Sequence, residues 1–479
     1  MKPRLNDMII LLPGITGSVL QKDGKDLWAL SGQAAWQALT SLGDSLQALQ
    51  LNGDDPGLDD LGDGISATRL MPDAHLVPGL VKIDGYSSIS RLVTRYFEVK
   101  AGHIDDFEPA NFFEFPYDWR RDNRVAAHRL QCLIEQRLPQ WRAHCGYQDA
   151  KVILLAHSMG GLVARYYLEV LEGWRNCRAL ITFGTPYRGS VDALNYLANG
   201  YKKLFIDLTE VMRSFTSIYQ LLPIYKMIKV GQEYQRVAET EAIPQVEKAR
   251  AEQALAFHRD IEAAVNRHWQ DAAYRDQYKA IPIVGTRQPT LQSAELTEGH
   301  LTVSRAIPVW IDSLLQDGDG MVPRLSAIPI ELSNEYRDTF FAERHSSLQA
   351  NDQVLNALYE RIKQMQVRGL SVIRGPSISP DKAEKAAISL ELDDVYRTDE
   401  PVEIKAQLIN SRENPGKLIA RIEPVGMALT PIEGNFQETE AGWVLPLELA
   451  PGLYRLEVRT RQAGPLAPSP VHDIFEVIP

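Results

Sequence analysis

Short runs of apolar residues recur along the N-terminal part of the chain, and each ends at a glycine, a proline or a small polar residue. Runs of this length are typical of strands buried on both faces, as in parallel sheets. Longer stretches with helical periodicity separate them, and parallel strands need such crossover connections. The pattern predicts an α/β sheet with helices on both faces, whose strands include Met8 to Leu12, Val152 to Ala156, Leu180 to Phe183 and Ile281 to Val284.

Two long segments interrupt this alternation. The first, at about residues 21–109, contains the Gly- and Asp-rich stretch 52–64, which is typical of an exposed loop. The second, at about residues 190–279, has a mostly helical pattern and lies between two predicted strands. Because loops at the carboxyl ends of parallel strands usually carry the functional site, we expect both insertions to form caps over it.

The pattern changes after Val367, where a polar, proline-containing stretch indicates a linker at residues 369–386. Beyond it, six short segments alternate apolar and polar residues between turn signals. Such segments are typical of an antiparallel β-sandwich. We therefore predict an α/β domain at residues 1–368 and an all-β sandwich of immunoglobulin-like shape at residues 387–479, without a disulfide because the segment has no Cys pair.

Composition narrows the class of protein. The chain has 479 residues, of which 44% are hydrophobic and 24% charged, as in ordinary globular proteins. Its net charge of −11 repels phosphate backbones, so nucleic acid is not an expected partner. Three cysteines, Cys132, Cys145 and Cys177, are an odd number and predict reduced thiols. The first apolar run is too short for a signal peptide, and none approaches the roughly 20 residues of a membrane span. We therefore expect a cytoplasmic protein without an integral membrane anchor.

The strongest chemical motif is A-H-S-M-G-G at residues 156–161, which follows a predicted strand and precedes a helical stretch. It matches the nucleophile elbow G-x-S-x-G, with Ala156 in place of the first glycine. A serine in such a turn has a strained backbone and needs small residues two positions before and after it, which Ala156 and Gly160 provide. The motif therefore predicts that Ser158 is a catalytic nucleophile.

A serine hydroxyl becomes a good nucleophile only when a base removes its proton and an acid orients that base. In α/β-hydrolases the three residues follow the order serine, acid, histidine. Asp319, in the segment D-G-D-G-M-V-P at residues 317–323, and then His345 satisfy this order. We choose Asp319 as the acid because Gly-x-Val-Pro follows it directly. Asp317 is the alternative acid, and otherwise a turn residue.

The remaining histidines lack this order or context. His157 neighbours Ser158, and because adjacent side chains point apart along a strand, we expect a structural role for it. His258 and His268 lie too far apart for the one-turn spacing of a metal pair. We expect neither a metal nor another cofactor.

An acyl-transfer site also needs two N–H donors that face the developing oxyanion. The N–H of Met159, directly after the serine, is the first by the geometry of the elbow. The turn L-P-G-I-T-G-S at residues 12–18 follows an early strand, and we predict that Ile15 N–H is the second donor, with Thr16 as the alternative. This turn could instead hold phosphate, but the chain has neither G-x-G-x-x-G nor a P-loop lysine, which disfavours nucleotide binding.

Together these motifs resemble the lecithin:cholesterol acyltransferase family, which includes phospholipid:diacylglycerol acyltransferases, a lysosomal phospholipase and bacterial relatives. The likeness spans about residues 8–364. Its segments are, in order, the turn at 12–18, D-G-Y at 84–86, F-P-Y-D-W-R at 115–120, the serine elbow, F-G-T-P-Y-R-G-S at 183–190, F-T-S-I-Y-Q-L-L-P at 215–223, and G-D-G-M-V-P at 318–323 before His345. The resemblance implies an α/β-hydrolase fold.

The resemblance also implies transfer of an acyl group from a lipid ester to Ser158, then to water or an alcohol. Two features differ from the family: the chain lacks the signal peptide and paired cysteines of secreted members, and the C-terminal sandwich is not part of the family core. Within residues 115–120 we expect Asp118 and Arg120 to form a structural ion pair and Trp119 to pack near the site.

The predicted function is that of a serine-dependent lipid acyl hydrolase of phospholipase or lipase type, whose lipid ester substrate could lie at a membrane surface. Hydrolysis is preferred over acyl transfer to an alcohol because water is always available. Two alternatives stay open. One is a general carboxylesterase or thioesterase, and the other is an interaction protein whose β-sandwich recruits a protein partner while the hydrolase domain is secondary.

Overall fold

A computed structural model of the protein describes residues 2–28, 47–72, 74–77, 81–203, 206–332, 339–368, 386–410, 417–426, 430–440, 442–461 and 467–479. All but the last residue of the linker predicted at 369–386 lies outside the described residues.

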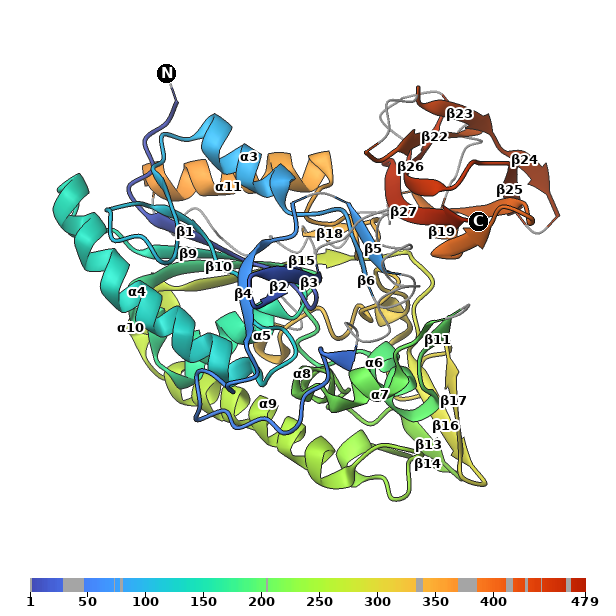
Figure 1. Ribbon diagram of the computed structural model, residues 1–479, viewed down its shortest axis with the longest axis horizontal. Helices are drawn as coiled ribbons and strands as arrows, with labels where there is room; N and C mark the ends of the chain where they lie inside the picture. Colours follow the sequence, from blue (N-terminus) through green and yellow to red (C-terminus); the bar gives the residue numbers. More distant parts are fainter. Residues whose placement is uncertain are drawn as a thin grey trace.

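A seven-stranded sheet forms the centre of the N-terminal domain (Figure 1). Its order is β18-β15-β10-β9-β1-β8-β7, and every neighbouring pair is parallel. The bounds are β1 Met8–Leu12, β7 Ala101–Gly102, β8 Phe112–Glu114, β9 Val152–His157, β10 Cys177–Phe183, β15 Lys279–Gly285 and β18 Phe340–Phe341. The four predicted apolar runs lie in β1, β9, β10 and β15, which confirms the α/β fold class. The other three strands have only two or three residues, too few for a pattern to predict them.

Helices cover both faces of this sheet (Figure 1). On one face, α3 (Ser87–Tyr96) packs against α11 (Asp352–Arg368). On the other lie α4 (Asn123–Cys145), α5 (Gly160–Arg165), α9 (Lys248–His268) and α10 (Ala272–Gln277). The longest, α4, begins after Asp122, whose carboxylate accepts the N–H of Arg124, and ends at Gly146 in the left-handed conformation.

The insertion between β10 and β15 is largely helical, as its pattern predicts, and it includes α9 and α10, but it also has short strands. It contains α6 (Val191–Asn199), α7 (Thr209–Ser214) and α8 (Thr216–Gln220), together with β11 (Lys202–Lys203), β12 (Ile206–Asp207), β13 (Ile228–Val230) and β14 (Glu233–Gln235). The β13–β14 hairpin joins a four-stranded sheet with β16 (Ser293–Thr297) and β17 (His300–Ser304), which come later in the chain. The sequence pattern of the insertion could not predict this pairing, because β16 and β17 lie outside the insertion.

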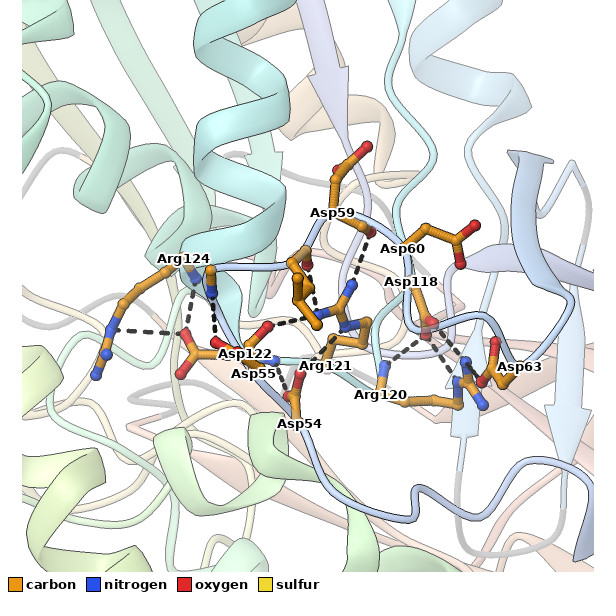
Figure 2. Close-up of polar contacts among 12 residues, drawn as sticks. Asp54, Asp55, Asp59, Asp60, Asp63, Asp118, Arg120, Arg121, Asp122 and Arg124 are labelled. Carbon is orange, nitrogen blue, oxygen red and sulfur yellow. Dashed lines mark hydrogen bonds and ion pairs between the residues drawn. The ribbon is translucent and has the colours of Figure 1, made fainter.

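The early insertion is fixed to the α/β domain by two buried arginines (Figure 2). Arg121 donates hydrogen bonds of 2.7, 2.9 and 2.8 Å to the backbone carbonyls of Asp59, Asp55 and Leu58, and one of 3.1 Å to the Asp54 carboxylate. The Gly- and Asp-rich stretch is largely exposed, as predicted. The hydrogen bonds from Arg121 nevertheless hold it against the α/β domain, and they are strong because the guanidinium is charged. It leads into β4 (Ile65–Leu70), which pairs with β2 (Ser18–Lys22), and β2 pairs with β3 (Lys25–Trp28).

The second arginine, Arg120, forms the predicted ion pair. Its Nη2 lies 2.5 Å from Asp118 Oδ2, and its Nε donates to Oδ1 of the same carboxylate at 2.9 Å. The same Nη2 lies 2.9 Å from the Asp63 carboxylate of the early insertion (Figure 2). The pair is therefore structural, since it attaches the insertion to the segment that precedes α4.

A separate β domain follows and has its own apolar core (Figure 1). Its sheets have the orders β19-β21-β25-β24 and β20-β27-β26-β22-β23, in which the pair β20–β27 is parallel and the others are antiparallel. The bounds are β19 Ala387–Glu391, β20 Val395–Arg397, β21 Val402–Ile409, β22 Leu418–Pro424, β23 Ile432–Asn435, β24 Gln437–Thr439, β25 Gly442–Leu447, β26 Gly452–Thr460 and β27 Val471–Ile478. All six predicted segments form strands, and β20, β23 and β24 are additional.

The β domain packs on the α/β domain through β27, which lies against β5 (His75–Val77) and β6 (Val81–Ile83) (Figure 1). A small apolar cluster at this contact contains Ala74, Leu453 and Ile474. Charged groups are paired around it: Asp473 with Lys82 and Arg344 at 2.7 Å each, Asp84 with Arg455 at 2.5 Å, and Glu343 with His472 at 2.7 Å. Because a buried charge is costly unless it is paired, these contacts favour one arrangement of the two domains.

Among the described residues, no helix is both long enough and apolar enough to span a membrane. The three cysteines are free thiols, with Cys177 buried, Cys145 partly buried and Cys132 exposed.

The pair between His472 and Glu343 predicts a pH-dependent domain contact. Burial disfavours the charged imidazolium, but the charge and hydrogen bond of Glu343, with the charges of Glu457 and Asp84, raise the pKa of His472 to about 9. A raised pKa adds stability that is complete below the ordinary histidine value of about 6.5 and is lost as the pH rises through about 9. Thermal unfolding should therefore show a stabilisation of wild type over His472→Gln at pH 6 that disappears by pH 10.

His300→Gln, at an exposed histidine of β17, is the matched control and should follow wild type at every pH. A difference between wild type and His472→Gln that stays constant from pH 6 to pH 10 would contradict the assignment.

Candidate active site

Ser158 lies in the sharp turn between β9 and α5, and its backbone has a φ of 51°. This left-handed conformation is rare for a residue with a Cβ atom. The N–H of Ser158 donates to the carbonyl of Phe183 at 2.8 Å, and its own carbonyl accepts the N–H of Gly161 at 3.0 Å. The predicted order of strand, strained turn and helix is present.

The turn leaves no room for a side chain at three nearby glycines, Gly14, Gly160 and Gly161. A Cβ atom on Gly160 would lie 2.3 Å from the Pro13 carbonyl oxygen, and one on Gly161 would lie 2.0 Å from Thr185 Oγ1. From the other side, a Cβ atom on Gly14 would lie 2.9 Å from that of Ser158. Glycine at positions 14 and 160 therefore lets the turn at residues 12–18, named the 12–18 loop, pack directly on the elbow, and Gly161 likewise makes room for Thr185.

The three predicted catalytic residues meet at this turn and all are buried. His345 Nε2 lies 2.9 Å from Ser158 Oγ, and His345 Nδ1 lies 2.7 Å from Asp319 Oδ2. Because a carboxylate can only accept, Nδ1 carries the proton, and Nε2 is left to accept the serine hydroxyl. This is the tautomer that a general base needs.

Asp319 is held by the backbone of its own loop. Its Oδ1 accepts the N–H groups of Met321 at 3.0 Å and Val322 at 2.7 Å, and its carbonyl accepts the N–H of His345 at 2.8 Å. The alternative acid, Asp317, instead lies 3.7 Å from Arg287. The geometry therefore brings Asp319 to the histidine.

The two predicted oxyanion donors lie in the elbow and in the 12–18 loop that packs on it. Met159 follows Ser158 and is buried, and Ile15 lies in the 12–18 loop. In the part of the chain that the structure describes, no backbone hydrogen bond engages either N–H. Thr16, the alternative donor, has a φ of 62°, and its hydroxyl donates to the Ile15 carbonyl at 2.5 Å.

Three aromatic side chains hold the 12–18 loop. The Tyr86 hydroxyl accepts the N–H of Gly14 at 2.7 Å, the Tyr117 hydroxyl donates to the Pro13 carbonyl at 2.8 Å, and Trp119 Nε1 donates to the Ser18 carbonyl at 3.0 Å. Trp119 thus packs near the site as predicted. The roles of Tyr86 and Tyr117 were missed, although both lie in segments singled out as family-like.

His157 links this loop to His345. Its Nε2 lies 3.3 Å from the His345 carbonyl oxygen, and its Nδ1 lies 2.9 Å from the Tyr86 hydroxyl. Since a carbonyl can only accept, Nε2 is protonated and Nδ1 accepts from the tyrosine. Burial and the charge of His345 lower the pKa of His157 to about 3, so the ring is neutral. Its role is structural, as expected, but the two imidazole rings lie side by side, with centroids 5.1 Å apart.

Comparison with known protein families gives a match in the central part of the chain. Residues 81–277 match the model of the lecithin:cholesterol acyltransferase family. This region therefore resembles that family. Over 116 residues, 22% of the chain, it is 30% identical to the lysosomal phospholipase A and acyltransferase of Canis lupus familiaris and to that of Homo sapiens. The matches cover only 28% and 27% of those two relatives.

Two solved structures are also similar, both of the lipase BlEst2 from Bacillus licheniformis. The mature form is 13% identical and the alignment covers 75% of this chain and 92% of the lipase, with a TM-score of 0.29. The propeptide form is 12% identical, with coverage of 99% and 94% and a TM-score of 0.31.

The region that matches the family model contains Ser158 and Met159, whereas Ile15, Asp319 and His345 lie outside it. The base and the acid are therefore placed by the fold around the family region, and their catalytic roles stay predictions that the geometry supports.

Asp192, at the start of α6, is a neighbour of the site that the sequence did not mark. Burial and the charge of Asp319 raise the pKa of this carboxyl to about 7, against the opposing charge of His345. Among the described residues its Oδ2 has no hydrogen-bond partner. A neutral carboxyl here at or below neutral pH limits the negative charge around Asp319.

The two histidines of α9 make separate structural contacts. His258 Nε2 lies 2.8 Å from the Gln220 carbonyl oxygen, and His268 Nδ1 lies 3.3 Å from the Glu169 carboxylate. Within the described ranges, no group of three His, Cys, Asp or Glu side chains could hold a metal ion.

The contacts of Tyr86 predict a cost in stability when its hydroxyl is removed. Tyr86→Phe leaves the Gly14 N–H and His157 Nδ1 without their partner in a buried site, so the free energy of unfolding should fall by about 1–3 kcal/mol. Urea unfolding followed by tryptophan fluorescence measures this change. The matched control is Tyr96→Phe, at an exposed tyrosine, which should change the free energy by less than about 0.5 kcal/mol. Equal losses in the two variants would contradict a buried role for the Tyr86 hydroxyl.

Proposed function

We propose that the protein is a serine-dependent lipid acyl hydrolase. One observation carries this proposal: Ser158, His345 and Asp319 form a hydrogen-bonded series at 2.9 and 2.7 Å in a strained elbow. A serine that a histidine can deprotonate, with an acid that orients the histidine, is the arrangement that acyl-transfer enzymes use.

In the first half of the proposed reaction, His345 Nε2 takes the hydroxyl proton while Ser158 Oγ attacks the ester carbonyl carbon. The oxyanion that forms accepts hydrogen bonds from the N–H groups of Met159 and Ile15. The imidazolium then donates its proton to the leaving alcohol, and the acyl group stays on the serine as an ester. Asp319 stabilises the imidazolium through Nδ1 throughout.

In the second half, His345 takes a proton from a water molecule, which attacks the acyl-serine carbonyl. The same two N–H groups stabilise the second oxyanion, and the fatty acid leaves as the proton returns to Ser158 Oγ. An alcohol in place of water would give acyl transfer by the same steps. Water is the default acceptor because it is always available.

The choice of a lipid ester is supported by the match to the lecithin:cholesterol acyltransferase family model and by the two similar proteins, each of which is a lysosomal phospholipase A and acyltransferase. The large insertion with α6 to α9 follows β10, one of the strands at the centre of the sheet, and so lies where a cap could cover an acyl chain.

The serine dependence gives the first test. Fatty-acid release should be measured from phospholipid, lysophospholipid, neutral glyceride and a soluble short-chain ester, with wild type and Ser158→Ala side by side. If the three residues act as a unit, Ser158→Ala should lower kcat by a factor on the order of 10⁶. Wild-type turnover by the pure variant would refute the proposal, whereas serine-dependent release from short-chain esters alone would favour a general esterase.

The choice between the two acidic residues gives a second test with a matched control. Asp319→Asn should lower kcat by a factor on the order of 10⁴, because the amide can stabilise the wrong imidazole tautomer. Asp317→Asn makes the same chemical change two residues away and should stay within about threefold of wild type. The reverse result would assign the acid to Asp317.

A further inference from the structure

The loop that carries His345 depends on contacts with other parts of the protein. It lies between β18 and α11, and turns rather than a helix or strand form it. Such a segment lacks a regular ladder of backbone hydrogen bonds. Single backbone hydrogen bonds, from His345 N–H to the Asp319 carbonyl and from Asp84 N–H to the Ser346 carbonyl, therefore determine its position together with side-chain contacts. The contacts of Glu343, Arg344 and Ser346 therefore bear directly on where the imidazole between them lies.

Glu343 attaches this loop to the β domain. It is fully buried, and its Oε1 accepts the backbone N–H of His472 at 2.8 Å while its Oε2 lies 2.7 Å from His472 Nδ1. The Asn351 side chain, just before α11, also donates to Oε2 at 2.7 Å. One buried carboxylate thus joins the loop, the N-terminus of α11 and β27.

Asp473, the next residue of β27, holds both neighbours of His345. Its Oδ2 forms a 2.7 Å ion pair with Arg344 Nε, and its Oδ1 accepts the Ser346 hydroxyl at 3.1 Å. Lys82 of β6 lies 2.7 Å from Oδ2 on the other side. Asp473 is only 1% exposed, so these charge-assisted contacts form away from competing water.

A second set of contacts joins the β domain to the loop that carries Asp319. The buried Gln288 side chain donates to the Ile388 carbonyl and accepts the Leu390 N–H, both at 3.0 Å, and both partners belong to β19. The backbone N–H of Gln288 donates to the carbonyl of Gly318 at 3.0 Å. Gly318 directly precedes Asp319, so β19 is connected to the acid through Gln288 and Gly318.

We propose that the β domain positions the catalytic base and acid, and that Asp473 is the main positioning residue for His345. This inference rests on the proposed serine mechanism. The elbow contacts described above come from the α/β domain, so the β domain acts on His345 and Asp319 and leaves Ser158 in place. The domain is then part of the active enzyme, in contrast to the hypothesis that it only recruits a partner.

The expected effect is a loss of turnover without a loss of substrate binding. A misplacement of a catalytic group by about 1 Å can lower the rate by on the order of 100-fold. Asp473 acts through the loop rather than on the substrate, so KM should change little. A role limited to stability would instead change the unfolding temperature and leave kcat of the folded protein unchanged.

The test compares Asp473→Asn with Asp399→Asn in the full chain, using a soluble short-chain ester that avoids lipid aggregation. Asp399 lies in the same domain, is exposed, and pairs with the partly exposed Arg397. We expect Asp473→Asn to lower kcat by roughly 10- to 100-fold, with KM within about twofold, and Asp399→Asn to match wild type. Ser346→Ala, which removes one hydrogen bond to Asp473, should lower kcat in the same direction by a smaller factor.

A stability control separates positioning from general loosening. Val458→Ala creates a cavity in the β-domain core at a fully buried position of β26. It should lower the unfolding temperature at least as much as Ser346→Ala while kcat at 25 °C stays at the wild-type value. If Val458→Ala and Ser346→Ala lose kcat in proportion to their loss of stability, or if Asp473→Asn keeps wild-type kcat, the positioning role is wrong.

Covalent labelling distinguishes this failure from failure of the proposed function. A fluorophosphonate reacts with a serine that a histidine activates, so wild type should be labelled at Ser158, Ser158→Ala should not, and Asp473→Asn should react more slowly. Labelling at the wild-type rate in Asp473→Asn would overturn the positioning role alone. Absence of labelling at Ser158 in wild type would overturn the serine mechanism and the inference built on it.

Discussion

The left-handed backbone at Ser158 is the constraint on which the rest of the site depends. A non-glycine residue in this conformation costs on the order of 1–3 kcal/mol and persists only where its surroundings enforce it. Here the enforcement comes from the fully buried β9, from the Phe183 carbonyl at the end of β10, and from glycines that let the 12–18 loop pack on the turn. The result is a Ser158 hydroxyl held at the end of β9 in a fixed direction. His345 and Asp319 then need only lie beside this hydroxyl.

A chain of buried hydrogen bonds then couples the two sides of the site. It runs from the Gly14 N–H to the Tyr86 hydroxyl, from that hydroxyl to His157 Nδ1, and from His157 Nε2 to the His345 carbonyl. Each donor and acceptor in this series has one consistent assignment, because the backbone groups at its ends can act in only one way. His157 stays neutral in its buried position, so the link adds no charge beside the imidazole that becomes positive in the proposed mechanism.

The sequence predicted the features that local chemistry determines. The four short apolar runs form buried strands because their residues leave no polar face, and the elbow followed from Ala156 and Gly160 around a serine. Asp319 was distinguished from Asp317 by the residues that follow it, and the hydrogen bonds of Met321 and Val322 give the physical reason. The missed features all depend on partners distant in sequence. The Tyr86 hydroxyl bonds a backbone group 72 residues away, β13 pairs with a strand beyond its own insertion, and Asp473 meets Ser346 across 127 residues. No periodicity records such contacts.

The position of the base and acid at the edge of the sheet explains why a second domain is useful to them. Both loops follow β15 in the chain. Among the described residues, β18 is the only strand of the central sheet beyond β15, and it pairs through two residues, Phe340 and Phe341. So short a strand provides few ladder hydrogen bonds to fix the loop that follows it. The elbow, by contrast, leaves a six-residue buried strand in the middle of the sheet. The sheet therefore holds Ser158 directly, whereas His345 needs contacts from other parts of the protein to hold it in position. Ion pairs and hydrogen bonds from β27 and β19 fix the two loops instead. The two domains therefore act as one catalytic unit in the proposed mechanism.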